Sequence, residues 1–140
     1  MIRVVIDTNV VVSAALDDES LPAAVLSLAI HKNILMFIST PILAEYEEVL
    51  SRPHLKLPPE RVKAFLAEIH GSAKVVHPTR IISRIKKDEP DNRFLECAQA
   101  ADANYLVTGN IKHFPQNFEN TTIVTPKQFL DLLLPHVAQP

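Results

Sequence analysis

The sequence predicts an α/β fold, a three-layer sandwich with a central, mainly parallel sheet of about five strands. Two observations lead to this prediction. Short, uniformly apolar runs alternate along the chain with stretches of helical periodicity, and such runs are typical of parallel strands that are buried on both faces. Alternating strands and helices favour right-handed crossover connections. Because the chain has 140 residues, 47% of them hydrophobic, we expect a single domain over residues 1–140.

The predicted elements follow one another in a regular order. The apolar runs predict strands at residues 4–6, 34–38, 74–77, 105–107 and 122–124. Helical periodicity predicts helices at residues 9–16, 21–31, 41–50, 59–70, 91–103 and 126–134. Residues 81–87 fit either a short helix or a basic loop. Two helix starts are clearly marked, because Thr40-Pro41 and Thr125-Pro126 each give a capping hydroxyl followed by proline at the first helical position.

Composition limits the classes of function. The net charge of -2 gives no overall basic field, so a nucleic acid would have to bind a local patch. With only two glycines, Gly71 and Gly109, no Gly-rich phosphate loop can be built. The single Cys97 cannot form an internal disulfide, and no stretch reaches the roughly 18 to 20 apolar residues of a membrane span. We therefore expect a soluble cytoplasmic protein without a signal peptide or membrane anchor, and we expect Cys97 to be a buried helix residue.

Acidic side chains lie at the ends of predicted strands, where open parallel sheets place their functional crevice. Asp7 ends the first strand, although Asp7, Thr8 or Asn9 could equally well serve only to cap the following helix. On the helix at residues 41–50, Glu45 and Glu47 both flank the apolar stripe while Glu48 points away from it. Periodicity alone does not choose between Glu45 and Glu47, and a solvated acidic helix face explains them too.

A third acidic group begins the helix at residues 91–103. Asp88, Glu89 and Asp91 crowd its first turn, where the helix dipole stabilises negative charge. Asp91 lies one turn before the buried stripe and is the acid best placed to face the core. We expect Glu96 to face solvent and Asp102 to lie on the surface. The strand at residues 105–107 is followed by a further polar group, Thr108-Gly109-Asn110.

Four ordered segments of the chain resemble the PIN domain family, the small metal-dependent ribonucleases that include the toxins of many bacterial and archaeal toxin-antitoxin pairs. The segments are VVIDTNVVVSAAL, ISTPILAEYEEVLSRP, DNRFLECAQAADANYLVTGN, and HFP with the closing IVTPKQFL. The resemblance covers nearly the whole chain and implies a PIN-like fold. It places the family's acids on Asp7, Glu45 and Asp91, and so favours Glu45 over Glu47. Asn110 stands where many members carry a fourth aspartate, and an amide is a neutral, weaker ligand for a hard cation.

The resemblance implies a divalent-metal-dependent endoribonuclease with a catalytic set of Asp7, Glu45, Asp91 and Asn110. Three carboxylates in one crevice need a cation among them or protonation of some of them, because like charges about 4 Å apart repel by about 4 kcal/mol at an effective dielectric of 20. Oxygen ligands favour Mg²⁺ or Mn²⁺. We expect Asp7 and Asp91 to be the principal metal ligands, with Glu45 binding directly or through water. Thr108 and Asn110 would orient water, metal ligands or phosphate. The resemblance also implies an RNA substrate, a small antitoxin partner and a homodimer.

Substrate binding needs positive charge, since phosphate neutralisation dominates affinity for RNA. Of the basic residues, Arg93 and Lys112 are the preferred contacts because they adjoin the acids, and Thr8 and Thr108 complete the predicted substrate side. His113 also lies beside the acids, but we expect a surface or capping histidine. The other candidate cations are Arg52, Lys56, Arg80, Arg84, Lys86 and Lys87.

Two other functions are compatible with parts of the pattern. A phosphoacceptor domain would also end strands with aspartate and could use Lys127, but it needs paired acids after the first strand and an aspartate after the central one. This chain has neither. A PIN-like module that binds RNA or protein without cutting is the second alternative, and Asn110 is its main support.

Overall fold

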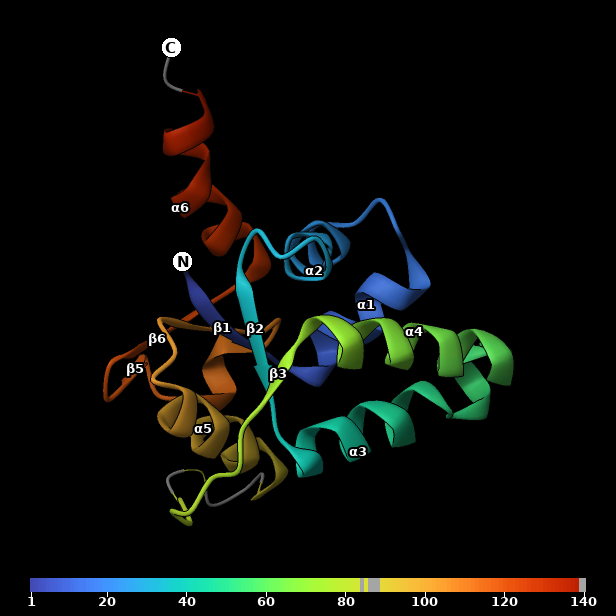
Figure 1. The fold of residues 1–140 in the computed structure, drawn as a ribbon, viewed down its shortest axis with the longest axis horizontal. Coiled ribbons are helices and arrows are strands. Elements are labelled where there is room, and N and C mark those ends of the chain that lie inside the picture. Colours follow the sequence, from blue (N-terminus) through green and yellow to red (C-terminus); the bar gives the residue numbers. More distant parts are fainter. Residues whose placement is uncertain (84, 86–88, 139–140) are drawn as a thin grey trace.

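The computed structural model describes residues 1–83, 85 and 89–138 (Figure 1). Its elements, in chain order, are β1 (Arg3–Ile6), α1 (Thr8–Leu16), α2 (Leu21–Ile30), β2 (Leu35–Ile38), α3 (Thr40–Leu50), the 3₁₀ turn η1 (Pro53–Leu55), α4 (Pro59–Ser72), β3 (Lys74–Val75), α5 (Glu89–Ala101), β4 (Tyr105–Val107), the 3₁₀ turn η2 (Ile111–His113), β5 (Asn117–Phe118), β6 (Thr121–Val124) and α6 (Pro126–Ala138).

The strands form one mixed sheet in the order β3-β2-β1-β4-β6-β5. Strands β3, β2, β1, β4 and β6 run parallel, and β5 pairs antiparallel with β6. The mainly parallel α/β sheet is therefore confirmed, with five parallel strands at the predicted places. Strand β5 is not predicted by the sequence, because Asn117–Phe118 is only two residues long and contains no apolar run. Strand β1 lies inside the sheet, and the chain returns to its other side with β4.

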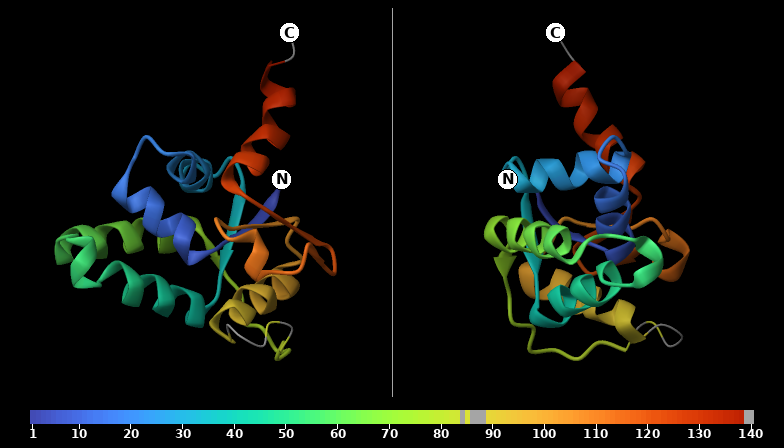
Figure 2. Two further views of the ribbon diagram at one scale, coloured as in Figure 1. Left: turned by 180° about the vertical axis from the view of Figure 1, so that it is seen from behind. Right: turned by 90° about the vertical axis from the view of Figure 1, so that its right-hand side faces the viewer.

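Helices cover both faces of the sheet. Figures 1 and 2 show α1 to α4 gathered on one side and α5 on the other, while the last turns of α6 extend away from the body. Val4, Val5 and Ile6 of β1 are completely buried between these layers. This burial on both faces explains why the strand is uniformly apolar rather than alternating.

Capping residues fix the helix starts close to their predicted positions. Thr125 and Gln128 cap α6 reciprocally: the Gln128 amide donates to Thr125 Oγ1 (3.1 Å), and the Thr125 amide donates to Gln128 Oε1 (2.9 Å). For α3, however, the predicted cap Thr40 is one residue late. Ser39 is the N-cap, since its Oγ accepts from the Ile42 amide at 3.4 Å.

The segment before α5 is joined to that helix by two buried side chains. Asn92 accepts from the Ile85 amide (2.9 Å) and donates to the Ile85 carbonyl (2.7 Å). Glu96 Oε2 accepts from the Ile82 amide at 2.9 Å and lies 2.9 Å from Arg93 Nη2. The prediction that Glu96 faces solvent is therefore wrong, because the residue is 8% exposed. The described positions within residues 81–87 are neither helix nor strand, and Arg84, Lys86, Lys87 and Asp88 lie outside the described residues.

Cys97 is buried and Asp102 is exposed, as predicted. Burial raises the pKa of the Cys97 thiol to about 12. Among the described residues, no helix combines the length and apolar character needed to cross a bilayer.

The contacts of Glu96 predict that its loss destabilises the fold. Glu96→Ala removes the acceptor for the Ile82 amide and the partner of Arg93, so we expect the free energy of unfolding in urea to fall by about 1–3 kcal/mol. Glu48→Ala is the matched control, because Glu48 pairs with Arg52 on an exposed helix face and should cost under about 1 kcal/mol. Equal losses in the two variants would contradict this account of Glu96.

Candidate active site

The carboxyl ends of β1 and β4 form the centre of the candidate site. The two strands pair in parallel with Ile6 opposite Val107, and the Asp7 amide donates to the Val107 carbonyl at 2.9 Å. Asp7 and Thr108, which follow these strands, therefore lie side by side. The strands that follow β1 in the chain, β2 and β3, lie on one flank of β1, and β4 and β6 lie on its other flank. The ends of β1 and β4 are therefore the topological switch point, at which α/β sheets open a crevice.

Both carboxylate oxygens of Asp7 are held by hydrogen bonds. Oδ1 accepts from the Thr8 amide at 2.7 Å, and Oδ2 accepts from the Thr108 hydroxyl at 2.8 Å. Thr108 Oγ1 in turn accepts from the Asn110 amide at 3.0 Å. Asp7 is also the N-cap of α1. Capping and a place in the crevice, which the sequence left as alternatives, are thus combined in one residue.

Glu45 lies next to Asp7 because α3 is fixed to the end of β1. The hydroxyl of Tyr46, which is fully buried, donates to the Ile6 carbonyl. One residue earlier, Glu45 Oε2 accepts from the Thr8 hydroxyl. Burial raises the pKa of Tyr46 well above its usual value, so the hydroxyl stays protonated and can donate this hydrogen bond throughout the ordinary pH range.

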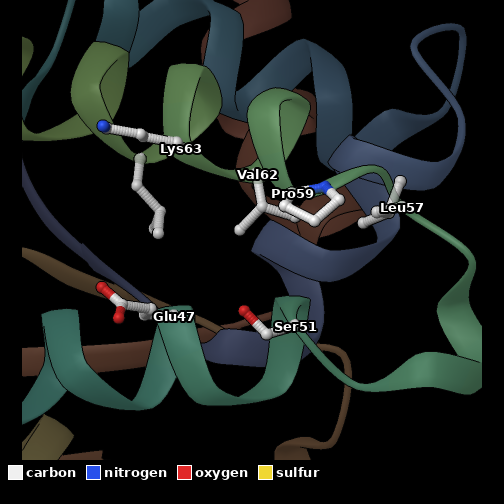
Figure 3. Close-up of a pocket in the computed structure, with 7 residues that line it drawn as sticks. Glu47, Ser51, Leu57, Pro59, Val62 and Lys63 are labelled. Atoms are coloured by element: carbon white, nitrogen blue, oxygen red, sulfur yellow. The ribbon is translucent and has the colours of Figure 1, made fainter.

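Glu47 points to a different part of the molecule. It is exposed and lines a separate pocket of about 400 Å³ between α3 and α4. Figure 3 shows Glu47 and Ser51 on the α3 side of this pocket and Val62 and Lys63 on the α4 side. Of the two acids that periodicity left open, only Glu45 shares a pocket with Asp7.

Asp91 and His113 lie next to each other in the same crevice as Asp7 and Glu45. Asp91 lies in the first turns of α5, with its side chain 18% exposed, and His113 Nδ1 is 3.8 Å from Asp91 Oδ2. His113 belongs to η2, which follows the Asn110 loop. The histidine is thus on the surface, as expected, but its side chain also faces the acids.

These residues surround one open pocket of about 430 Å³, which we call the acid pocket. Its lining comes from α1, α3, α5 and the segment after β4: Asp7, Thr8, Asn9, Val12, Ser13, Glu45, Val49, Asp91, Asn110 and His113. All three predicted acids and Asn110 therefore meet at one place. As the side chains lie, no three His, Cys, Asp or Glu residues in the described part of the chain form a ready-made metal cluster.

The electrostatics of the acid pocket suit a hydrated divalent cation. Burial raises the pKa of the Asp7 carboxyl and the charge of Glu45 raises it further, whereas hydrogen bonds from Thr108 and Thr8 and the charge of His113 lower it. A nearby cation would relieve both effects that disfavour the ionised carboxylate. The donor atoms of the three acids are oxygens, and Mg²⁺ keeps several waters and needs only one or two carboxylates. The residues present therefore fit a Mg²⁺ or Mn²⁺ ion.

The four predicted substrate contacts differ in how much of each side chain is exposed. Thr108 is completely buried and Thr8 is 7% exposed, and their hydroxyls bind Asp7 and Glu45. The Thr108 hydroxyl thus orients Asp7, and contact of Thr8 and Thr108 with a substrate stays a prediction. Arg93 is 30% exposed with its Nη2 held by Glu96. Lys112 is exposed on η2, between Asn110 and His113.

Two of the other candidate cations, Arg52 and Arg80, and also Lys127 form ion pairs outside the acid pocket. Arg52 pairs with Glu48, Arg80 with Glu119 and Lys127 with Asp131, at 2.8–2.9 Å and on exposed surfaces. Lys56 is exposed beyond η1. Lys127 does not line the acid pocket, so the structure offers no support for a phosphoacceptor site that uses it.

The part of α1 beyond Thr8 that faces the acid pocket was not among the predicted site residues. Asn9 Oδ1 accepts from the Gly109 amide at 3.0 Å and so ties the start of α1 to the loop after β4. Val12 and Ser13 follow Asn9 at three and four residues, and Val49 follows Glu45 at four. This i, i+3, i+4 spacing from residues next to the acids was the available signal.

The chain is similar to known proteins both in sequence and in fold. The sequence profile described as PIN domain matches residues 3–112. An uncharacterized protein of Methanocaldococcus jannaschii is 27% identical over 142 residues, which cover 93% of this chain and 90% of that protein. The crystal structure of VapBC2 from Rickettsia felis, bound to a DNA fragment from their promoter, contains a chain that is similar with a TM-score of 0.61 and 20% identity. The match covers 89% of this chain and 98% of that one, and it supports the fold.

The raised pKa of Asp7 predicts how a neutral replacement affects stability. In the folded chain the pKa of the Asp7 carboxyl lies above its ordinary value of 3.8. The unfolded chain therefore ionises more easily, and the free energy of unfolding falls as pH rises from 3.8 through the folded-state pKa. Asparagine does not titrate and caps helices as well as aspartate. In chelator, we expect the Tm of Asp7→Asn to equal or exceed that of the wild type at pH 8, with the difference shrinking toward pH 4. Thermal unfolding followed by circular dichroism measures it, and a lower Tm for the variant at pH 8 would contradict the prediction.

Proposed function

The chain belongs to the PIN domain family, whose members are generally nucleases, and from this premise we propose that it is a divalent-metal-dependent endoribonuclease that hydrolyses RNA phosphodiester bonds. The main support is the meeting of Asp7, Glu45 and Asp91, which are far apart in the chain, around one pocket. Hydrolysis of a phosphodiester requires stabilisation of negative charge on the phosphate and a nucleophilic water, and convergent carboxylates are typical of sites that hold a cation for both purposes.

In this proposal Asp7 and Asp91 hold Mg²⁺ or Mn²⁺, and Glu45 completes the site directly or through water. The bound cation supplies positive charge beside the attacked phosphate and makes hydroxide accessible near neutral pH. The chain's own residues provide the preorganisation. Thr108 and the Thr8 amide fix Asp7, and the Thr8 hydroxyl fixes Glu45, so these two carboxylates are oriented before the substrate binds.

Phosphate binding falls to basic residues at the edge of the acid pocket. Lys112 is the preferred contact, because it is exposed within η2 between two residues that line the pocket. Arg93 is a second candidate that would have to share its guanidinium with Glu96. Asn110 adds a neutral polar group where many family members carry an acid.

We further propose that the protein is the toxin of a toxin-antitoxin pair, a cytoplasmic homodimer that binds a small antitoxin protein. The support is the resemblance of the four sequence segments and the similarity in fold to a VapBC2 chain. A small reading frame for a DNA-binding protein next to the gene, whose product copurifies with this chain, is the expected observation.

Removal of single acids predicts loss of cleavage without loss of fold. We expect Asp7→Asn and Asp91→Asn each to lower the rate of RNA cleavage in Mg²⁺ or Mn²⁺ by about 100-fold or more, and chelator to abolish wild-type cleavage. The assay uses a mixed RNA panel with purified protein, and circular dichroism checks the fold. Near-wild-type activity of either variant would overturn the assignment of the site.

The pair Glu45 and Glu47 provides a matched control. Glu45→Gln should lower cleavage strongly, whereas Glu47→Gln should keep it within about twofold, because Glu47 lines the other pocket. RNA binding that persists in chelator, combined with no cleavage under any condition, would favour the alternative of a PIN-like module that binds without cutting.

The replacement of Asn110 tests the missing fourth acid. Because a carboxylate is a stronger ligand than an amide for a hard cation, Asn110→Asp should preserve or strengthen Mn²⁺ binding. Isothermal titration with Mn²⁺ measures the affinity. Weaker binding by a folded Asn110→Asp variant would show that Asn110 plays another part.

A further inference from the structure

A second, smaller hollow continues from the acid pocket across the carboxyl ends of β4 and β6. It has a volume of about 220 Å³, and we call it the neutral groove. It shares Asn9, Ser13 and Asn110 with the acid pocket, and beyond them its lining includes Pro22, Gly109 and Pro126. Because three residues line both hollows, a molecule whose phosphate lies among the acids would reach the neutral groove with its next chemical group.

The chemistry of the neutral groove differs from that of the acid pocket. None of the described residues that line it carries a charge, so it lacks the cations that supply most of a protein's affinity for phosphate. Asn9, Ser13 and Asn110 instead offer amide and hydroxyl groups that can both donate and accept hydrogen bonds. Pro22 and Pro126 add apolar ring surface. Hydrogen-bonding edges beside an apolar surface are what a nucleobase and its ribose require.

The loop after β4 keeps the neutral groove open and orders its polar groups. The Gly109 amide donates to Asn9 Oδ1 at 3.0 Å, so the two N–H donors of Asn9 Nδ2 remain for a ligand. A Cβ atom added at Gly109 would come within 3.4 Å of the same Oδ1. This is an ordinary van der Waals distance, and it shows that the loop lies close against Asn9 of α1.

We propose that the neutral groove binds the base and ribose of the nucleotide next to the phosphodiester bond that is cut. The inference rests on the proposed function, since it takes the acid pocket as the place of that bond. Base edges are accessible to amide and hydroxyl groups only when the base is unpaired and unstacked, so the substrate is single-stranded at this position. Asn9, Ser13 and Asn110 then determine which base is preferred.

Substrates that lack one base test the proposal with the unmodified protein. Once the cleavage position in a short single-stranded RNA is mapped in Mn²⁺, a series is made in which each nucleotide in turn keeps its ribose and phosphate but loses its base. We expect one position next to the cut to show a drop in kcat/KM of about tenfold or more, the size expected from one or two lost hydrogen bonds. The other positions should change little.

Variants at Pro22 connect that position to the neutral groove. Pro22 lines the neutral groove but not the acid pocket, and the cap of α2 comes from Ser20, which is left unchanged. Pro22→Met should fill the groove, lower kcat/KM for the intact RNA about tenfold and remove the difference between intact and base-deleted substrates. Pro22→Lys should do the same, because a longer side chain excludes the base whatever its charge. Ala24→Met, on the exposed side of α2, is the control and should behave as wild type.

Each result has a defined meaning. Equal cleavage of the intact RNA and of every base-deleted RNA by the wild type would overturn this inference while leaving the proposed nuclease in place. Faster cleavage by Pro22→Lys than by Pro22→Met would also overturn it, because it would indicate a phosphate in the groove. If the wild type cuts no RNA in Mn²⁺, the proposed function fails and this inference fails with it. The wild-type series decides the question even if a Pro22 variant does not fold.

Discussion

The buried carboxylate of Asp7 is the constraint on which the rest of the site depends. Its two oxygens accept bonds from the Thr8 amide and the Thr108 hydroxyl, so one side chain caps α1 and joins the ends of β1 and β4. Burial at this junction raises the pKa of the carboxyl. The ionised form of Asp7 is thus destabilised by burial, as is typical of functional sites, and the neutral groups of Thr8 and Thr108 hold its side chain in place.

The other acids reach the same pocket because buried neutral groups anchor their helices. Tyr46 fixes α3 to the end of β1 and so places Glu45, while the buried side chains of Phe94 and Leu95 pack α5 against the sheet and so place Asp91. Neutral hydrogen bonds can be buried at much lower cost than ion pairs. The charge is consequently concentrated in the acid pocket, and the adjoining neutral groove is left with amide, hydroxyl and proline surfaces that suit the uncharged parts of a nucleotide.

Sequence alone determined the fold class and the five parallel strands. Uniformly apolar runs and helical periodicity are local properties, and the layers of an α/β sandwich follow from them. The acids Asp7 and Asp91 could be singled out because they stand at the end of a strand and the start of a helix. Resemblance was still required for Glu45, because Glu47 lies at the opposite flank of the same apolar stripe and periodicity treats the two alike.

Only the tertiary structure decided the features that depend on contacts between distant segments. It separated Glu45 from Glu47 because α4 packs against one side of α3 and forms another pocket there. It buried Glu96, which periodicity places on the outside of α5, because the segment at Ile82 covers that side of the helix. It also placed the buried hydroxyl of Thr108 against the carboxylate of Asp7. Hydrophobic periodicity predicts which side of one helix or strand is apolar. It cannot predict which polar side chains are buried, because the segments that cover them come from elsewhere in the chain.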